Sequence, residues 1–187
     1  MREYVSFSEL KIHHECTHRH KLEYIDNLKK FKGNVYTAFG SAIHALNENL
    51  VMDHNIDKSK VFSLAFEEEI AKIAPEVVDL NTKIEMTEQA ANIYVHVLEQ
   101  LESNFPGYEV VSVEEELFEK IENYDLKFKG YIDLVIKTPD GKYHIIDWKS
   151  CSWGWDARKK SNKVLGYQLV FYKWFWASKH GISPHDI

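Results

Sequence analysis

The chain has 187 residues, of which 44% are hydrophobic and 28% are charged, a composition typical of a globular protein with one domain and a real core. The first residues show no secretory signal pattern, and no apolar run approaches the roughly 20 residues that are needed to span a bilayer. The two cysteines, Cys16 and Cys151, give no disulfide framework, so we expect an intracellular, cytoplasmic protein without a membrane partner.

The formal net charge of −6 argues weakly against a nucleic-acid partner, because contacts with phosphates need Lys and Arg. The charges are clustered, however. Acidic residues gather in the segments FEEEIAK and VEEELFE, and basic residues gather in LKKFKG and DARKKSNK. A protein with one basic edge is compatible with this pattern, so nucleic acid is not excluded as a partner.

The first half of the chain carries helical signals. The segment SFSELKIHHEC predicts a short helix that is capped by Ser6 or Ser8. Apolar residues at helical spacing predict three further helices, at about 37–52, 60–73 and 84–105.

The second half of the chain changes to strand signals. The segments GYEVVSVEEELFEKI, LKFKGYIDLVIKT and KYHIIDWKS predict three strands, and PDG predicts the turn between the last two. The segment KVLGYQLVFYKWFWASKHG then predicts an amphipathic-to-buried helix that ends at Gly181. An antiparallel meander covered by helices indicates an α/β or α+β domain.

Two carboxylates and a lysine stand out in the second and third predicted strands. Period-two alternation places Asp147 and Lys149 on the same strand face, and a hairpin can bring Asp133 beside Asp147. Two close carboxylates repel each other unless a cation lies between them, and oxygen-rich sites of this type suit Mg²⁺ or Mn²⁺. An isolated Asp-x-Lys is more often a solvated strand edge. The apolar residues on both sides of Asp147 favour a site instead, because an unpaired buried charge is costly.

From about Ser6 to Tyr172 the chain resembles the RecB-like branch of the PD-(D/E)XK nuclease superfamily. The resemblance rests on the order and spacing of SFSELKIHHECTHRHKLEYI, FGSAIH, GYIDLV, IIDWKS and GYQLVFY. It implies a restriction-endonuclease-like α/β core, a mixed sheet that starts antiparallel and is flanked by helices, in a single nuclease domain over residues 1–187. Residues 36–106 would form its helical portion, and residues 108–187 its catalytic sheet and last helix.

The resemblance assigns metal ligation to one histidine, two aspartates and one backbone carbonyl, which are His44, Asp133, Asp147 and the carbonyl of Trp148. One or two Mg²⁺ or Mn²⁺ ions held there would polarise a phosphate oxygen and lower the pKa of a bound water. Lys149 would hold or help to deprotonate that water, and Gln168 and Tyr172, on one helix face, would position the metal ligands or the strand. Without the resemblance, His44 would be expected in the core, Gln168 on the surface and Tyr172 among core aromatics.

Further residues have two possible roles. Glu115 or Glu116 adds a carboxylate from the preceding strand if it points inward, and is a solvated edge residue if it does not. The segment WGWDARKKSNK offers cations for phosphates and two rings for stacking on unpaired bases, namely Arg158, Lys159, Lys160, Lys163, Trp153 and Trp155. A solvated loop with two packed tryptophans is equally compatible with this segment.

Two features depart from the family pattern. Some RecB-like nucleases hold an iron–sulfur cluster on four cysteines, but only Cys16 matches one of these positions and Cys151 lies in the wrong place. We therefore expect no complete iron–sulfur cluster in this chain. The last core strand of the family would begin at ISPHDI, where the sequence stops, so we expect a C-terminal truncation, or a strand supplied by another chain through exchange or oligomerisation.

The resemblance implies a Mg²⁺- or Mn²⁺-dependent deoxyribonuclease, most simply an exonuclease that acts on a single strand or a duplex end. It would serve DNA recombination, repair or phage DNA processing, alongside helicase or recombination proteins. Two alternatives keep the same fold: a non-catalytic DNA-binding or assembly module, and an iron–sulfur nuclease whose other cysteines are absent from this chain.

A third alternative is a transition-metal protein built on HHECTHRH, residues 13–20. On one continuous helix these side chains divide between two faces, so they cannot converge on a single ion. We therefore expect Cys16 to be a small packed residue and the histidines to be a polar surface.

Overall fold

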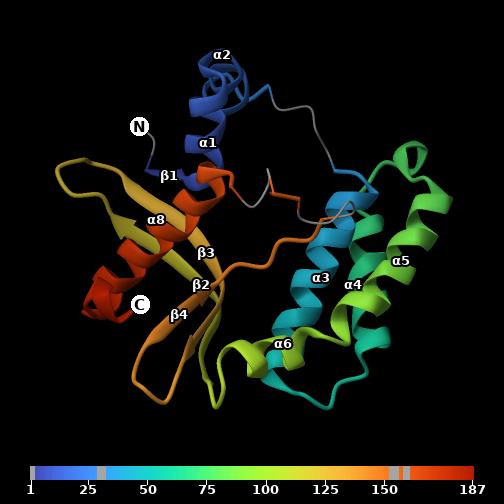
Figure 1. Cartoon of the computed structure of the whole chain (residues 1–187). Helices are drawn as coiled ribbons and strands as arrows, with labels where there is room; N and C mark the ends of the chain where they lie inside the picture. Colours follow the sequence, from blue (N-terminus) through green and yellow to red (C-terminus); the bar gives the residue numbers. More distant parts are fainter. Residues whose placement is uncertain (1–2, 29–32, 152–155, 158–160) are drawn as a thin grey trace.

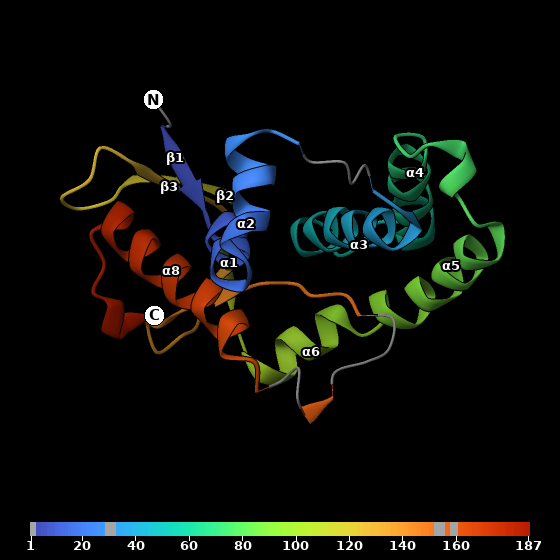
Figure 2. The ribbon, with the colours of Figure 1, turned by 90° about the horizontal axis from the view of Figure 1, so that it is seen from above.

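Helices flank one mixed sheet in the computed structural model, which describes residues 3–28, 33–151, 156–157 and 161–187. Figure 1 shows the sheet with α1 and α8 on one side and the helices α3 to α6 on the other, and Figure 2 shows the same layers from above. The predicted α/β class is therefore confirmed. Among the described residues, no helix is long and apolar enough to cross a membrane.

The N-terminal segment forms β1 (Tyr4–Ser6), α1 (Phe7–Glu15), α2 (Thr17–His20) and a π-helical turn (Lys21–Ile25). The Ser6 hydroxyl accepts the backbone N–H of Glu9 at 3.3 Å, so Ser6 is the N-cap of α1, one of the two residues predicted for this position. The backbone is extended at Cys16, where α1 ends. The segment HHECTHRH is therefore not one continuous helix.

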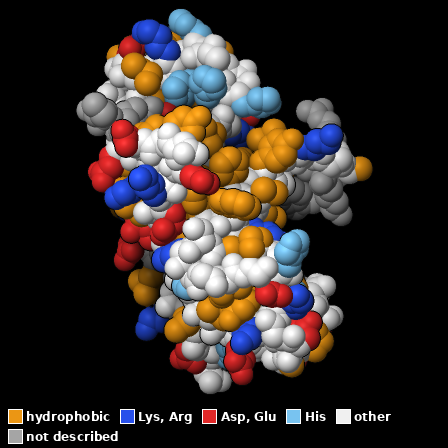
Figure 3. Space-filling model, turned by 90° about the vertical axis from the view of Figure 1, so that its left-hand side faces the viewer, with side chains coloured by type: hydrophobic (Ala, Val, Ile, Leu, Met, Phe, Trp, Pro, Cys, Tyr) orange, Lys and Arg blue, Asp and Glu red, His pale blue; other side chains and the backbone are white. Residues whose placement is uncertain are grey.

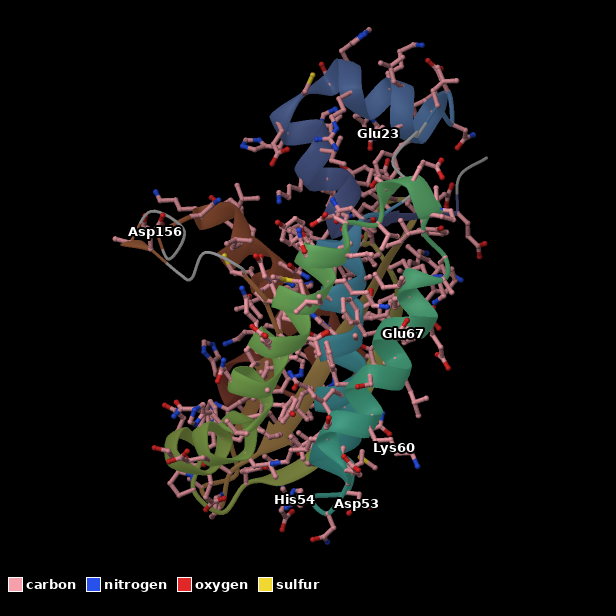
Figure 4. The ribbon with its side chains drawn as sticks, turned by 90° about the vertical axis from the view of Figure 1, so that its right-hand side faces the viewer. Glu23, Asp53, His54, Lys60, Glu67 and Asp156 are labelled. Carbon is pink, nitrogen blue, oxygen red and sulfur yellow. The ribbon has the colours of Figure 1, made fainter. Side chains whose placement is uncertain are left out.

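The helical layer consists of α3 (Val35–Met52), α4 (Lys58–Ile70), a 3-10 turn (Pro75–Val77), α5 (Leu80–Tyr94) and α6 (Val97–Asn104). Its centre is a cluster of rings from α3 and α4, in which Phe39 contacts Phe62 and Phe66. Figure 4 shows the outer side of this layer, where Lys60 and Glu67 of α4 point away from the sheet. The helices predicted at 37–52 and 60–73 are confirmed to within three residues.

The single helix predicted at 84–105 is wrong, because the structure divides it into α5 and α6. The division follows the packing of its apolar stripe. Met86 and Ala90 of α5 pack into the phenylalanine cluster of α3 and α4. Val97 and Leu101 of α6 instead pack against the sheet, in the cluster that contains Leu134. One straight helix would not reach both clusters.

The sheet contains β2 (Glu109–Lys120), β3 (Lys127–Lys137) and β4 (Tyr143–Ile146) as the predicted antiparallel meander, with β3 in the middle. The short strand β1, which the sequence analysis did not predict, pairs with β3 in parallel and makes the sheet mixed. β1 lies beside residues 127–129 of β3, whereas β4 lies beside residues 134–137. This edge of β3 is therefore open at residues 130–133.

The helix α8 (Lys163–His180) covers the sheet face opposite to α3 and α6. Its buried Trp176 packs with Leu117 and Phe128 of the sheet. The helix ends where predicted, at Gly181, which has a φ of 64° and therefore favours glycine. The outer side of α8 is also apolar: Tyr167, Val170 and Trp174 are exposed, and hydrophobic side chains gather across the middle of the face in Figure 3.

Candidate active site

The two predicted aspartates face each other where the sheet opens. The last pair between β3 and β4 joins Leu134 to Ile146, so the next residue on each side places Asp133 opposite Asp147. Asp133 is only 6% exposed. The backbone N–H of Trp148 donates to Asp133 Oδ2 at 2.5 Å, and this hydrogen bond ties the segment after β4 to β3.

The helix α3 brings His44 to the same place. His44 Nδ1 lies 3.4 Å from Asp133 Oδ1, and this hydrogen bond raises the pKa of His44 although burial opposes the shift. Gly40, one turn earlier on α3, faces the segment after β4, since a Cβ at Gly40 would lie 3.4 Å from Ser150 Oγ. The predicted Gly-x-x-x-His helix thus contacts both halves of the site.

Three further predicted residues surround the carboxylate of Asp147. Lys149 Nζ lies 2.5 Å from Asp147 Oδ2, and the Gln168 amide donates to Asp147 Oδ1 at 3.1 Å. Burial raises the pKa of Asp147, and the hydrogen bond from Lys149 opposes that shift. The Gln168 amide also donates to the Tyr172 hydroxyl at 2.8 Å, and burial raises the pKa of Tyr172 to about 12. Tyr172 is therefore a neutral phenol at physiological pH.

One carboxylate of the site was missed by the sequence analysis. Glu114 lies on β2 opposite Asp133, because the register pairs Val113 with Leu134 and Glu115 with Ile132. Oxygens of Glu114 and Asp133 and a ring nitrogen of His44 lie within 4.8 Å of one another. The Glu114 backbone has a φ of 47°, an uncommon conformation for a residue with a side chain, and such outliers often mark functional sites.

Glu48, one turn after His44 on α3, extends this acidic group. Burial, together with the charge of the neighbouring Glu114 carboxylate and a hydrogen bond shared with it, raises the pKa of Glu48 to about 7. Negative charge is therefore in excess around Asp133. The excess is relieved either by a proton on Glu48 or by a cation.

The two glutamates that follow Glu114 on β2 point away from the site. Glu115 lies on the α8 side of the sheet, where Trp176, Lys179 and His180 contact its carboxylate. Glu116 lies on the opposite, open face and accepts a hydrogen bond from the hydroxyl of Tyr131. The structure therefore brings neither Glu115 nor Glu116 to the site, because strand phase gives that position to Glu114.

The predicted nucleic-acid-binding segment lies mostly outside the described residues. This applies to Trp153, Trp155, Arg158, Lys159 and Lys160. Lys163 is described: it is the first residue of α8 and is exposed. It precedes Gln168 on the same helix, so α8 carries a cation at its solvent end and two site residues further along.

The histidine-rich segment 13–20 does not form a metal cluster. The described residues contain one group of three or more potential ligands, which is that of His44, Glu114 and Asp133. His20 Nε2 instead contacts the buried Glu9 at 2.7 Å. Cys16 is exposed and accepts the backbone N–H of Arg19, so the expectation of a packed cysteine is wrong, because α1 ends there and the chain turns outward.

The donor atoms of the site fit a divalent cation. An imidazole nitrogen and carboxylate oxygens suit Mg²⁺ or Mn²⁺, and a cation bound there would offset the excess negative charge. Lys149 already neutralises Asp147 on the far side of the site. The residues that could hold the ion are therefore His44, Glu114 and Asp133, with Asp147 opposite them across the open strand edge.

One carboxylate within β3 and one directly after the adjacent β4, with a lysine two residues after the second, define a metal-assisted hydrolase on a restriction-endonuclease-like core. A family model described as PD-(D/E)XK nuclease superfamily matches residues 4–185, so the chain belongs to that superfamily. This membership indicates a metal-dependent nuclease that hydrolyses phosphodiester bonds. The match is to the superfamily as a whole. No curated protein sequence matches the chain.

Proposed function

We propose that this chain is a Mg²⁺- or Mn²⁺-dependent deoxyribonuclease of the RecB-like branch, and that it acts as an exonuclease. The observation that supports this most strongly is the convergence of Asp133, Asp147 and Lys149 at the open edge of β3. A metal ion bound to the carboxylates and to His44 would polarise the phosphate and activate a water.

Lys149 is the side chain through which the protein, and not the metal ion, brings positive charge to the site. Its ammonium group is held by Asp147 at 2.5 Å, yet its side chain is 36% exposed, so an incoming phosphate can reach it. An ammonium group fixed at that place offsets the negative charge that develops on the phosphate in the transition state. The Asp147 contact also prevents the flexible lysine side chain from turning away.

Gln168 and Tyr172 act on the site through hydrogen bonds. The Gln168 amide group contacts both Asp147 Oδ1 and the Tyr172 hydroxyl, so it fixes the orientation of the carboxylate. Tyr172 is buried and fixes Gln168 in turn. We assign both as positioning residues. His44 has a comparable effect on Asp133 from α3, in addition to its role as a ligand.

The finer assignment is supported by the motif order of the sequence. The series from SFSELKIHHEC to GYQLVFY is that of RecB-like exonucleases, which favours DNA ends over internal sites. The cellular setting would be the cytoplasm, in recombination, repair or phage DNA processing with helicase or recombination proteins. The iron–sulfur variant of this branch would need three cysteines besides Cys16, and Cys151 is the only other cysteine of the sequence.

The test is a nuclease assay with the purified chain on end-labelled linear duplex, linear single-stranded and covalently closed circular DNA. We expect degradation of linear DNA with Mg²⁺ or Mn²⁺, and intact circles. Replacing Lys149 by alanine should lower kcat by about 10²–10³-fold, the usual effect of removing one charge-stabilising group. Cleavage of circular DNA as fast as linear DNA would show that the chain is an endonuclease and not an exonuclease.

A matched control uses a second Asp–Lys pair on the surface. Lys142, in the turn between β3 and β4, has its Nζ 2.9 Å from Asp186 Oδ1, and both side chains are exposed. The Lys142→Ala variant should retain the parent rate within about twofold. Equal rates for parent and Lys149→Ala would refute the assignment of Lys149. Binding of DNA without cleavage under any divalent ion would favour the non-catalytic assembly module.

A further inference from the structure

The open face of the sheet carries a row of cations and rings that leads to the site. Residues of β3 at period two share one face, so Lys127, Lys129 and Tyr131 lie in line with Asp133. The opposite face of β3 holds the buried Phe128 and packs against α8. Beyond Asp133 the row ends, because Leu134 and Ile136 pack under α3 and α6 while Val135 packs in the cluster of α8. Before Asp133 the row is open, and Tyr131 is 44% exposed.

Neighbouring strands widen this row into a patch. The register places Tyr4 beside Lys127 on one edge, and Phe118 and Lys120 on β2 opposite Lys129 and Lys127. Lys129 Nζ lies 5.2 Å from the centre of the Tyr4 ring and 5.7 Å from that of Tyr131, while Lys127 Nζ lies 4.2 Å from the Phe118 ring. Cations and rings thus alternate over the open face.

A groove joins this patch to the site. It has a volume of about 330 Å³ and runs from Tyr4, Lys129 and Tyr131 to Gln168 and Tyr172. The groove follows the open edge of β3 between β1 and β4, and Gly130 forms part of its wall. It therefore opens on the residues that hold Asp147.

We propose that this patch, defined as Tyr4, Phe118, Lys120, Lys127, Lys129 and Tyr131, is the track along which single-stranded DNA enters the site. The inference rests on the proposed nuclease function and adds the substrate form and its path. Exposed rings stack on unpaired bases whatever their sequence, and lysines beside them contact the backbone phosphates. A paired duplex hides its base faces and would leave these rings unused.

The dimensions of the row suit a strand that lies along β3. A strand rises about 3.3 Å per residue, so Lys129 is about 13 Å and Lys127 about 20 Å from Asp133. The track therefore holds a short run of nucleotides next to the bond that is cut. It also places cations in contact with DNA although the whole chain has a net charge of −6.

Two acidic residues limit the charge of the patch. Glu116 lies 3.4 Å from Lys129 and accepts the hydroxyl of Tyr131, and Glu3 lies 3.6 Å from Lys127 at the rim. Glu116 thus competes with a phosphate for Lys129. Removing its charge should strengthen binding of a strand, an outcome that a purely structural role of the patch does not produce.

The experiment measures binding without cleavage. Fluorescence anisotropy with a labelled 20-nucleotide oligothymidine in EDTA gives Kd for the full chain and its variants. We expect Tyr131→Thr, which keeps a strand-forming residue but removes the ring, to raise Kd about tenfold. Lys129→Gln should raise Kd and reduce the slope of log Kd against log salt by about 0.7, the loss of one phosphate contact. Glu116→Gln should lower Kd severalfold.

The control is Lys60→Gln on α4, an exposed lysine on the far side of the molecule that Figure 4 labels. It should leave Kd and the salt slope unchanged. Circular dichroism melts of all variants separate lost binding from lost folding. If Tyr131→Thr and Lys129→Gln remain folded and bind as the parent does, the track is refuted even when the chain cuts DNA. Patch-dependent binding without cleavage would instead keep the track and refute the nuclease.

Discussion

The carboxylate of Glu115 is predicted to stabilise the fold at neutral pH. It accepts hydrogen bonds from Ser112 at 2.5 Å, His180 at 2.7 Å, and Trp176 and Lys179 at 2.8 Å. Burial alone would raise its pKa. The four donors, with Lys179 the strongest, outweigh burial and lower the pKa to about 2 from an ordinary 4.5. Replacing Glu115 by glutamine removes the charge and keeps the shape.

The size of the effect follows from this pKa. The difference between a pKa of 4.5 and one of about 2 corresponds to at most about 3–4 kcal/mol, because a tenfold change in proton affinity is worth about 1.36 kcal/mol. Lys179 and His180 are 32% and 36% exposed, so solvent screening reduces the expected loss to about 1–2 kcal/mol. Because the folded pKa is the lower one, the stabilisation is complete above about pH 4.5 and disappears as the pH falls towards 2.

Urea unfolding of the parent and of Glu115→Gln at pH 7 and at pH 3 measures this contribution. The difference between the two proteins should be about 1–2 kcal/mol at pH 7 and should shrink at pH 3. Glu122→Gln, at an exposed position in the β2–β3 turn, serves as control and should change little at either pH. A loss of the same size at both pH values would refute the electrostatic origin and leave only packing.

Three further changes test the site and the core. Gly130→Ala would place a Cβ 2.8 Å from Tyr172 Cε1 and should therefore displace Tyr172. We expect kcat to fall at least tenfold while the circular dichroism spectrum stays unchanged, and parent-like kinetics would contradict the positioning role of Tyr172. Glu114→Gln should raise the Mn²⁺ concentration needed for half-maximal activity by about 10–100-fold, and an unchanged requirement would remove Glu114 from the site. Phe62→Ala, at a side chain only 2% exposed, should lower the free energy of unfolding by about 3–5 kcal/mol in urea, and a loss below 1 kcal/mol would refute its place in the core.

Local patterns were sufficient for much of the fold and for the centre of the site. The apolar stripe of α3, the period-two alternation of β3 and the glycine that ends α8 each act within a few residues. The pairing of Asp133 with Asp147 also follows from local geometry, because the tight turn between β3 and β4 fixes the register. Lys149 follows Asp147 closely enough to meet it from the same segment.

Long-range packing decided what the sequence pattern left open. β1 is three residues long and forms only because it pairs with β3 more than 100 positions later. The break between α5 and α6 depends on which cluster each half can reach, and Val95 and His96 at the break carry no Pro or Gly signal. The expected packing of Cys16 failed for the same reason, since the end of α1 turns it outward.

The run Glu114–Glu116 shows how one irregular residue changes the prediction of a site. Counting from the start of the β2–β3 pair, where Glu109 meets Lys137, four regular steps would place Val113 opposite Asp133 and turn Glu115 towards the same face. The register shifts by one between Val110 and Ser112, and a shift of one residue exchanges the two faces of a strand. Counting from the turn, where Lys120 meets Lys127, six steps lead correctly to Glu114. The register at the β2–β3 turn therefore predicts the site residue correctly, because the register shift lies beyond the site as counted from the turn. The three consecutive glutamates differ in environment: Glu114 lies at the metal site, Glu115 contacts α8 and Glu116 lies on the open face.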